Sequence, residues 1–347
     1  MLNARPGTDA SVRVSPLMSI PVVLRKLGHE PEPIFREAGL TLAHFENPEN
    51  EISYIAASRL LALCVQKTGC QHFGLLMAEG VSSSSLGIVG FMLRFAPDVR
   101  TALQTLQRNL ELHDQGGIPT LTSDGEYAIF GYAIHQPGAQ AIDQIYDLAM
   151  AVVYKILREL CGSKWRPTRI LLSRRPPTDA TPYKQLFRSP LRFGATQNAI
   201  VFPIRWLAQV PNGTDPLLYH FFEQEADALL DGRATDIVGR LRRLLHASIF
   251  NDTLRIHYIA QQLGMHERTL HRRLKNEGTS FRQQLDDIRY WVARQLLANP
   301  DNRVSEIATA LKYTEPAAFC RAFKRWSGCT PSQWRNDNAV PSGRREN

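Results

Sequence analysis

A short helical pattern occurs twice near the C-terminus of this 347-residue chain, at an offset of about 50 residues. Ile259-Ala260 in the first copy corresponds to Ile307-Ala308 in the second, and Gly278 corresponds to Gly328. In each copy a short amphipathic helix, a break and a second helix follow one another, which is the pattern of a helix-turn-helix unit. The repeat predicts an all-α domain with a divergent internal duplication.

The stretch between the two copies predicts one long helix. Apolar residues from Phe281 to Leu297 recur at helical spacing, and Pro300 ends the pattern. About 18 residues at about 1.5 Å each give a helix of about 27 Å. This length approaches one turn of DNA, roughly 34 Å, so the two units can face neighbouring turns of a duplex.

The second helix of the first unit carries a cationic face. Leu270 and Leu274 lie on one side and are expected to pack inward. The opposite side carries Arg268, His271, Arg272 and Lys275. In a helix-turn-helix unit this outer side meets the major groove, where arginine pairs with O6 and N7 of guanine. Lys275, one turn further on, suits a phosphate. The alternative interpretation of the whole helix is an exposed basic surface with no partner.

The second helix of the second unit has the same two-sided arrangement. Phe319 and Phe323 are expected to face inward. The outward positions are Ala317, Cys320, Arg321 and Lys324. Small residues beside an arginine allow a helix to sit deep in a groove, so this helix is a second candidate for contact with DNA.

The first 210 residues combine helical and strand patterns. Asp124-Gly125 lies between two alternating runs and predicts a β-hairpin. Amphipathic helices are predicted at 20–27, 51–69 and 98–113, a mostly buried helix at 146–160, and short strands at 168–173 and 199–204. Together these patterns predict an α+β domain in which helices carry a small sheet.

The net charge of +8 is concentrated in two blocks. Residues 251–336 hold 14 Lys and Arg against 8 Asp and Glu, and residues 161–205 hold 9 against 1. Arginine pairs can clamp a phosphate or carboxylate, so the second block is a candidate site for an anionic effector, through Arg174, Arg175, Arg188 and Arg192. A basic face that aids the approach to DNA, or a solvated surface, are the alternatives.

Signals for an enzyme are absent from the sequence. No metal-ligand, phosphate-loop or nucleophile motif occurs, so we expect no catalytic residue, metal or cofactor. His113 beside Asp114 is interpreted as an exposed helix end rather than a catalytic pair. Five cysteines without C-x-x-C spacing indicate reduced thiols in a cytoplasmic protein, and no apolar run approaches the roughly 18 residues that span a membrane.

Two C-terminal stretches carry a family resemblance: "IAQQLGMHERTLHRRLKNEGTSF" and "VSEIATALKYTEPAAFCRAFKRWSGCTPSQWR". They resemble the DNA-binding domain of AraC/XylS-type transcription regulators over about residues 240–336. The resemblance implies that Arg268, His271 and Arg272 occupy base-reading positions, and that Arg321 does so in the second unit beside Ala317 and Cys320. The family usually has glycine where Lys312 precedes Tyr313, so Lys312 is expected in a backbone conformation unfavourable to a side chain.

The N-terminal region resembles, more loosely, the arabinose-binding-like effector domain of one branch of this family. The resemblance rests on "IPVVLRKLGHEPEPIFREAGL", "SSLGIVGFMLRFAPDVRTALQTL" and "ATQNAIVFPIRWLAQ". It implies a small-molecule effector without identifying it, and RNA polymerase as a partner. It leaves open whether the protein activates or represses.

The sequence therefore predicts a regulator that binds double-stranded operator or promoter DNA under control of an effector. The expected boundaries are a flexible leader (1–15), an effector-binding domain (16–210), linker helices (211–250), a double helix-turn-helix domain (251–336) and a tail (337–347). A hinge is expected at Val210–Pro216, where breakers cluster, and the apolar linker segments favour a homodimer. An enzyme with an appended DNA-binding domain and an architectural DNA-binding protein without an effector are the alternatives.

Overall fold

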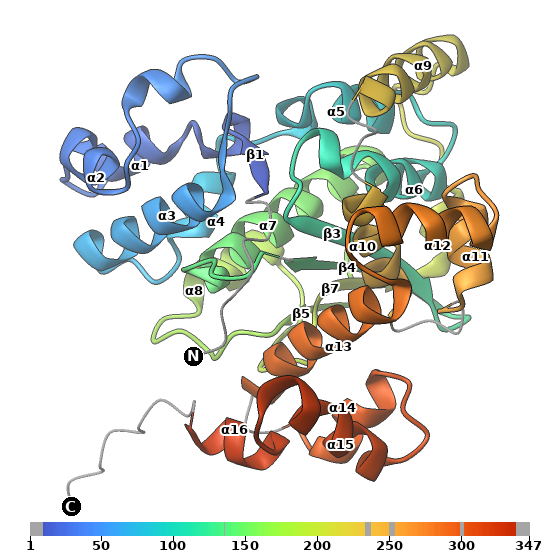
Figure 1. The fold of residues 1–347 in the computed structure, drawn as a ribbon. Coiled ribbons are helices and arrows are strands. Elements are labelled where there is room, and N and C mark those ends of the chain that lie inside the picture. Colours follow the sequence, from blue (N-terminus) through green and yellow to red (C-terminus); the bar gives the residue numbers. More distant parts are fainter. Residues whose placement is uncertain (1–9, 135, 233–236, 250–253, 299–301, 338–347) are drawn as a thin grey trace, which may run out of the picture. The chain divides into compact units, whose positions relative to one another are not determined.

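The computed structural model describes residues 10–134, 136–232, 237–249, 254–298 and 302–337 (Figure 1). The chain forms two compact units, Met1–Gly232 and Arg233–Asn347. The N-terminal unit combines a sheet with helices, and the elements described in the C-terminal unit are helices joined by turns. The predicted fold classes are therefore confirmed. No helix among these residues is long and apolar enough to cross a membrane.

A five-stranded sheet forms the centre of the N-terminal unit. Its order is β3-β4-β7-β5-β6, and only the β5–β6 pairing is parallel. The strands are β3 (Gly117–Ser123), β4 (Tyr127–Ile134), β5 (Arg169–Leu172), β6 (Leu191–Phe193) and β7 (Asn198–Pro203). The β3–β4 hairpin is confirmed: Gly125 has a φ of 96°, and the Asp124 carboxylate accepts hydrogen bonds from the Glu126 and Tyr127 amides.

Helix α7 (Ile142–Cys161) packs on β4 and β7 and is buried along most of its length, as predicted (Figure 1). Its neighbours include α3 (Tyr54–Thr68) and α4 (Phe73–Ala78). Ser53 caps α3 by accepting a bond from the Ala56 amide, and Asp98 caps α6 (Val99–Asn109) in the same way through Thr101. The remaining α-helices that the structure describes before residue 210 are α1 (Ile20–Lys26), α2 (Pro31–Glu37), α5 (Ile88–Phe95) and α8 (Thr181–Phe187).

The leader predicted at 1–15 is wrong from residue 11 onward. Strand β1 (Ser11–Arg13) pairs with β2 (Glu51–Ser53), and Val12 and Val14 are buried. The Arg13 amide also donates to the His113 carbonyl at 2.9 Å. Apolar side chains and distant hydrogen bonds therefore hold this segment in place, while residues 1–9 lie outside the described part of the chain.

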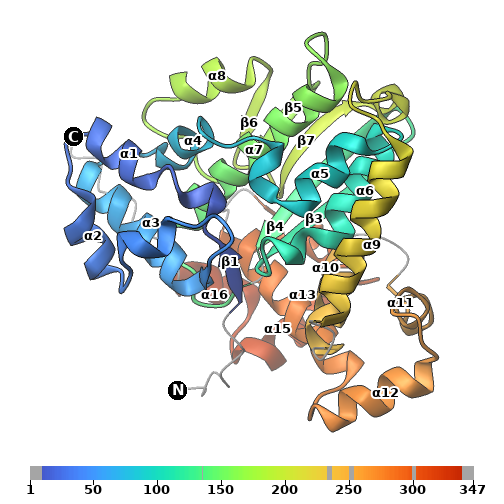
Figure 2. The same ribbon diagram turned by 90° about the horizontal axis from the view of Figure 1, so that it is seen from above.

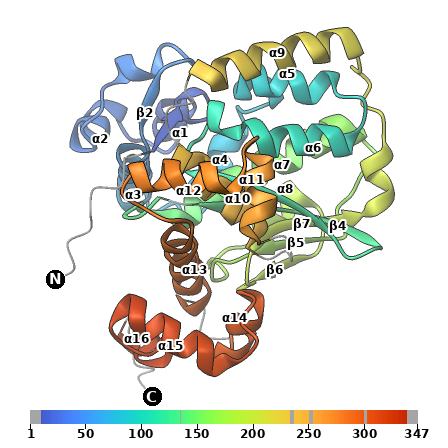
Figure 3. The ribbon, with the colours of Figure 1, turned by 45° about the vertical axis from the view of Figure 1, so that its right-hand side comes forward.

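The breaker-rich segment 211–216 is not a hinge in the structure. The Asp215 amide donates to the Phe95 carbonyl at 3.2 Å, and the Thr214 hydroxyl donates to the Ala96 carbonyl at 2.9 Å. Helix α9 (Pro216–Gly232), which Asp215 caps as expected, lies beside α5 (Figures 2 and 3). Because these bonds join 211–216 to the N-terminal unit, the division between units falls after Gly232 instead.

The C-terminal unit is built around α13 (Phe281–Ala298). In Figure 3 this helix lies between two groups of helices, one that precedes it in the chain and one that follows it. The preceding group is α10 (Ile237–Ser248), α11 (Ile256–Gln262) and α12 (Glu267–Asn276). The following group is α14 (Val304–Ala310), α15 (Pro316–Ser327) and α16 (Pro331–Asp337). Helix α10 was predicted as part of the linker helices at 211–250. In the structure it belongs to the C-terminal unit, because its apolar face packs against α11, α12 and α13. After Asp337 the predicted tail lies outside the described residues.

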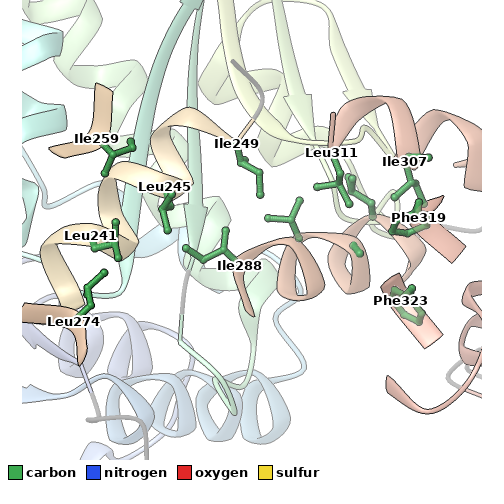
Figure 4. Close-up of a cluster of buried hydrophobic side chains, with 14 of the residues drawn as sticks. Leu241, Leu245, Ile249, Ile259, Leu274, Ile288, Ile307, Leu311, Phe319 and Phe323 are labelled. Atoms are coloured by element: carbon green, nitrogen blue, oxygen red, sulfur yellow. The ribbon is translucent and has the colours of Figure 1, made fainter. Parts of the chain in front are cut away.

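One cluster of buried side chains joins both halves of this unit (Figure 4). Leu241 and Leu245 of α10, Ile288 of α13, and Phe319 and Phe323 of α15 are all fully buried. Burying a side chain of this size contributes about 1.5–3 kcal/mol. The cluster therefore fixes both helix-turn-helix units to the same central helix.

The two helix-turn-helix turns have matching backbones but different residues. Gly264 follows α11 with a φ of 69°, and Lys312 follows α14 with a φ of 61°. Both lie in the left-handed region, which costs a residue with a side chain roughly 1 kcal/mol. The unfavourable backbone expected at Lys312 is therefore confirmed, and the fold of the second unit tolerates it.

We expect Lys312→Gly to stabilise the protein by roughly 0.5–1 kcal/mol, because glycine adopts a positive φ without the steric penalty. Urea unfolding of the full-length chain measures the effect. Gly264→Lys is the reciprocal variant and is expected to destabilise by about 1 kcal/mol. Lys324→Gly, within α15, is the control and is expected to destabilise by about 1 kcal/mol. A loss of stability in Lys312→Gly would contradict the strain at this turn.

Candidate DNA-binding surface and buried cavity

Helix α12 presents a cationic face to its surroundings. Leu270 and Leu274 are fully buried in the shared core. The four side chains predicted on the opposite side, Arg268, His271, Arg272 and Lys275, are all exposed. The short helix α11 and the Gly264 turn set the direction of α12, and Leu270 and Leu274 fix its rotation about its own axis. The arrangement presents positive charge along one side of a rigid helix.

Helix α15 has the same two-sided arrangement with less charge. Phe319 and Phe323 are buried, and Ala317, Arg321 and Lys324 are exposed. Cys320 differs from the expectation, because it is half-buried and packs against the shared core. Cys320 lies at the edge of the outer side, next to the buried Phe319, so part of its side chain faces the protein core.

Several other cations of this unit bind partners within the chain. Arg289 lies over the Tyr313 ring at 4.9 Å, and Arg294 lies over the Trp334 ring at 5.5 Å. Arg325 pairs with Asp286 at 3.0 Å. These contacts attach α14–α16 to α13, so the positive charge of these arginines is used for packing. The basic side chains of α12 and α15 described above point outward instead.

The basic block at 161–205 is divided between different environments. Arg174 forms an ion pair with Asp147, which is fully buried on α7, and the Tyr183 hydroxyl donates to Asp147 at 2.6 Å. Burial raises the pKa of the Asp147 carboxyl, and the Arg174 guanidinium opposes that rise. Arg188 follows the end of α8, Arg192 lies on the edge strand β6, and Arg175 follows Arg174 in the loop after β5. All three are exposed. Arg174 therefore already has a carboxylate partner inside the fold, which the sequence did not indicate.

His113 and Asp114 were expected at an exposed helix end, and this is wrong. Both side chains are buried, beneath β1 and next to a cavity of the N-terminal unit. The Asp114 carboxylate accepts hydrogen bonds from the Gly116 and Gly117 amides at 2.8 and 2.9 Å and from the Tyr132 hydroxyl. Burial, with the nearby Arg13 guanidinium, lowers the pKa of His113 to about 3, so its imidazole is neutral near pH 7.

Comparisons with known proteins agree with this architecture. A family model described as the arabinose-binding domain of AraC transcription regulators matches residues 28–210, and a helix-turn-helix domain matches residues 259–337. The chain is 30% identical to the HTH-type transcriptional regulator VirS of Mycobacterium tuberculosis, over 96% of this chain and 98% of VirS. It is 25% identical to the ornithine utilization regulator of Pseudomonas aeruginosa, over 90% and 93% of the two chains. The crystal structure of the transcriptional regulator CdpR from Pseudomonas aeruginosa aligns with a TM-score of 0.43 at 22% identity, over 90% of this chain and 97% of that one.

The two outward helices and the sheet-containing N-terminal unit define a DNA-binding transcription regulator with an N-terminal effector-binding domain. The chain belongs to the AraC family of transcription regulators. The relatives give no support to an enzyme with an appended DNA-binding domain or to an architectural protein without an effector.

We expect Arg174→Ala to destabilise the protein by about 3–5 kcal/mol, because it leaves Asp147 buried without its cation. Urea unfolding of the full-length chain measures this loss. Arg192→Ala, on the exposed edge strand, is the control and is expected to stay within about 0.5 kcal/mol of the parent protein. Equal stability of the two variants would show that the ion pair with Asp147 does not support the fold.

Proposed function

We propose that α12 and α15 are recognition helices that enter the major groove of double-stranded operator or promoter DNA. The observation that carries the proposal is the matched geometry of the two units: each has a buried apolar side on the shared core and an outer side with exposed cations. Through Arg268, His271 and Arg272, α12 reads base edges, and Lys275 contacts a phosphate. Within α15, Arg321 reads a base while Ala317 and Cys320 allow close approach and Lys324 contacts the backbone.

The unequal charge of the two helices indicates unequal roles. With four exposed basic or imidazole side chains on its outer side, α12 can form both base and phosphate contacts. The outer side of α15 has two cations beside the small Ala317. Phosphate contacts supply most of the affinity and base contacts supply specificity. We therefore assign the larger share of binding free energy to α12.

We further propose that the N-terminal unit controls this binding by taking up a small effector. A ligand shifts the balance between two arrangements of the protein only if it binds one of them better. A coupling of about 1–3 kcal/mol changes DNA affinity or activator competence by roughly 5–150-fold. By family resemblance, RNA polymerase is the second partner, and the protein acts in the cytoplasm. If the effector is anionic and binds in the basic block, Arg175, Arg188 and Arg192 are its remaining anchors, since Arg174 pairs with Asp147.

A homodimer is the proposed assembly, and α9 is the helix that supports it. Phe222 stacks on Phe91 and Phe95 of α5, with ring centroids 5.2 and 5.9 Å apart, so one side of α9 is covered. The other side exposes Leu217 by 85% and Phe221 by 54%. Exposed apolar side chains one helical turn apart are typical of a surface that binds a second molecule. The apolar face of α10 packs in the C-terminal core, so α9 is the helix of the predicted linker region 211–250 that offers an exposed apolar side.

Base reading is tested by three alanine variants. We expect Arg268→Ala and Arg272→Ala each to weaken binding to the preferred site by about 1–3 kcal/mol and to relax specificity at one base pair. Lys275→Ala is expected to weaken all sequences about equally and to reduce the salt slope by about one. Selection from a randomised DNA library, followed by anisotropy titrations at several salt concentrations, measures both effects.

Lys26→Ala, an exposed cation of α1 outside both basic blocks, is the control and is expected to bind DNA as the parent protein does. A uniform loss of affinity across all sequences in the two arginine variants would overturn their base-reading role.

The dimer is tested by light scattering at micromolar concentration. The parent protein is expected at twice the chain mass of 39.2 kDa, and Leu217→Glu with Phe221→Glu is expected at the single-chain mass. A buried, unpaired carboxylate in the interface opposes association. Val22→Glu places the same charge on an exposed apolar position of α1 and is the matched control, expected to remain dimeric. A monomeric parent protein, with and without DNA, would contradict the assembly.

A further inference from the structure

A cavity of about 90 Å³ lies within the N-terminal unit. Its wall is formed by α7 and α3 together with β1, β4 and the end of α6. Most of the lining is hydrocarbon, such as Leu61, Leu106, Phe130 and Val153. An engineered apolar cavity of about 150 Å³ binds benzene. The space here is smaller than that cavity, so it suits a compact ligand of roughly four non-hydrogen atoms.

The lining also includes a cluster of buried polar side chains. Tyr54, His113, Asp114 and Tyr132 border the cavity, and each is at least nine-tenths buried. Three hydrogen bonds occupy the Asp114 carboxylate. The His113 Nδ1 atom and the Tyr54 hydroxyl, by contrast, have no hydrogen-bond partner among the described residues. Buried polar atoms are usually satisfied, so an unsatisfied one beside a cavity indicates a ligand group or a water.

A water alone is an incomplete explanation for these atoms. An internal water needs two to four polar partners, and His113 Nδ1 and the Tyr54 hydroxyl are open to one. The rest of the wall is largely apolar, so a water leaves that part of the cavity unfilled. A ligand that fills the apolar part and places one polar atom against His113 satisfies both features of the cavity.

The charges around the cavity favour an uncharged ligand. His113 is neutral near pH 7, because burial and then the Arg13 guanidinium lower its pKa to about 3. The Arg13 guanidinium itself pairs with Glu49. An anionic ligand would meet the Asp114 carboxylate in an apolar surrounding without a free cation to balance it. A neutral imidazole can donate to a carbonyl or accept from a hydroxyl, depending on its tautomer.

We propose that this cavity is the effector site, and that it binds a compact, uncharged ligand with a hydrocarbon body and a single hydroxyl or carbonyl oxygen that meets His113 Nδ1. The proposal rests on the proposed function of the N-terminal unit and names the chemical class that it senses. It places the effector between α3 and α7, away from the exposed arginines Arg188 and Arg192. Occupation of the cavity by such a ligand would hold β1, α3, α7 and the β3–β4 hairpin together, because all of them contribute to its wall.

Three small probes of about four non-hydrogen atoms each test the ligand class with the full-length protein. Isothermal titration with acetone is expected to show saturable binding at one site per chain. Isobutene, which has the same shape but no oxygen, is expected to bind about five- to tenfold more weakly. Acetate is expected to give no measurable binding. This series needs no altered protein, and absence of acetone binding at millimolar concentration, or acetate binding as tight as that of acetone, overturns the proposal.

Two variants locate the probe. Ala149 of α7 lines the cavity, and Ala149→Leu is expected to abolish binding of acetone by filling the space. His113→Leu is expected to weaken acetone binding about tenfold and to leave isobutene binding unchanged. His72→Leu, outside the cavity lining, is the matched control and is expected to bind both probes as the parent protein does. Undiminished acetone binding in folded Ala149→Leu, checked by thermal unfolding, overturns the location.

A DNA titration separates this proposal from the proposed function. If acetone binds and changes operator affinity by fivefold or more, both stand. Acetone binding without any change in operator affinity supports the cavity as a binding site and contradicts its regulatory role. If other small molecules change operator affinity while acetone does not bind, the N-terminal unit is a sensor and the assigned cavity or ligand class is wrong.

Discussion

The apolar core around α13 is the constraint on which the DNA-binding unit depends. Ile288 is fully buried between the two helix-turn-helix units, and side chains of α10, α12 and α15 meet the same cluster (Figure 4). Each large side chain in it contributes about 1.5–3 kcal/mol, whereas the strained turn at Lys312 costs roughly 1 kcal/mol. The core therefore outweighs the turn, and Tyr313, packed against Phe319 beside it, helps to keep the chain in that conformation. A rigid core also fixes the spacing of the two outward helices, as simultaneous binding of both to one duplex requires.

The features that the sequence predicted well depend on neighbours a few residues away. Leu270 and Leu274 are one helical turn apart, so their burial and the exposure of Arg268 and Arg272 follow from the helical period alone. Caps such as Ser53 and Asp98 bond to amides three residues further on. The hairpin at Asp124-Gly125 closes between adjacent strands. Fold class, both helix-turn-helix units and their outer faces could be predicted because the signals are local.

The predictions that failed depend on partners distant in the chain. His113 is buried because β1, about a hundred residues earlier, pairs across it, and no local pattern reports that contact. Asp215 bonds to Phe95, so a run of breakers that indicates a linker is instead attached to the N-terminal unit. One local signal for the cavity was present: Asp114 precedes Gly116 and Gly117, and a Cβ at Gly117 would collide with the Tyr132 hydroxyl. Two glycines that close to an aspartate allow the backbone amides to approach its carboxylate.

The contacts that individual arginines make explain why the net charge overstates the number of cations available to bind DNA. Arg289 and Arg294 lie over aromatic rings, Arg325 pairs with Asp286, and Arg174 pairs with a buried aspartate. A guanidinium suits such positions, since it is planar, weakly hydrated and able to stack. These charges still contribute to the long-range potential that attracts DNA, but their donors and faces are already engaged in the fold. Specific contact with DNA is then made by cations that have no such internal role. In the C-terminal unit these cations lie on the outer faces of α12 and α15. Buried leucines and phenylalanines fix the rotation of the two helices. Packing therefore engages some arginines in internal contacts and orients others outward. A sequence whose basic residues are widely spread thus forms a defined DNA-binding surface.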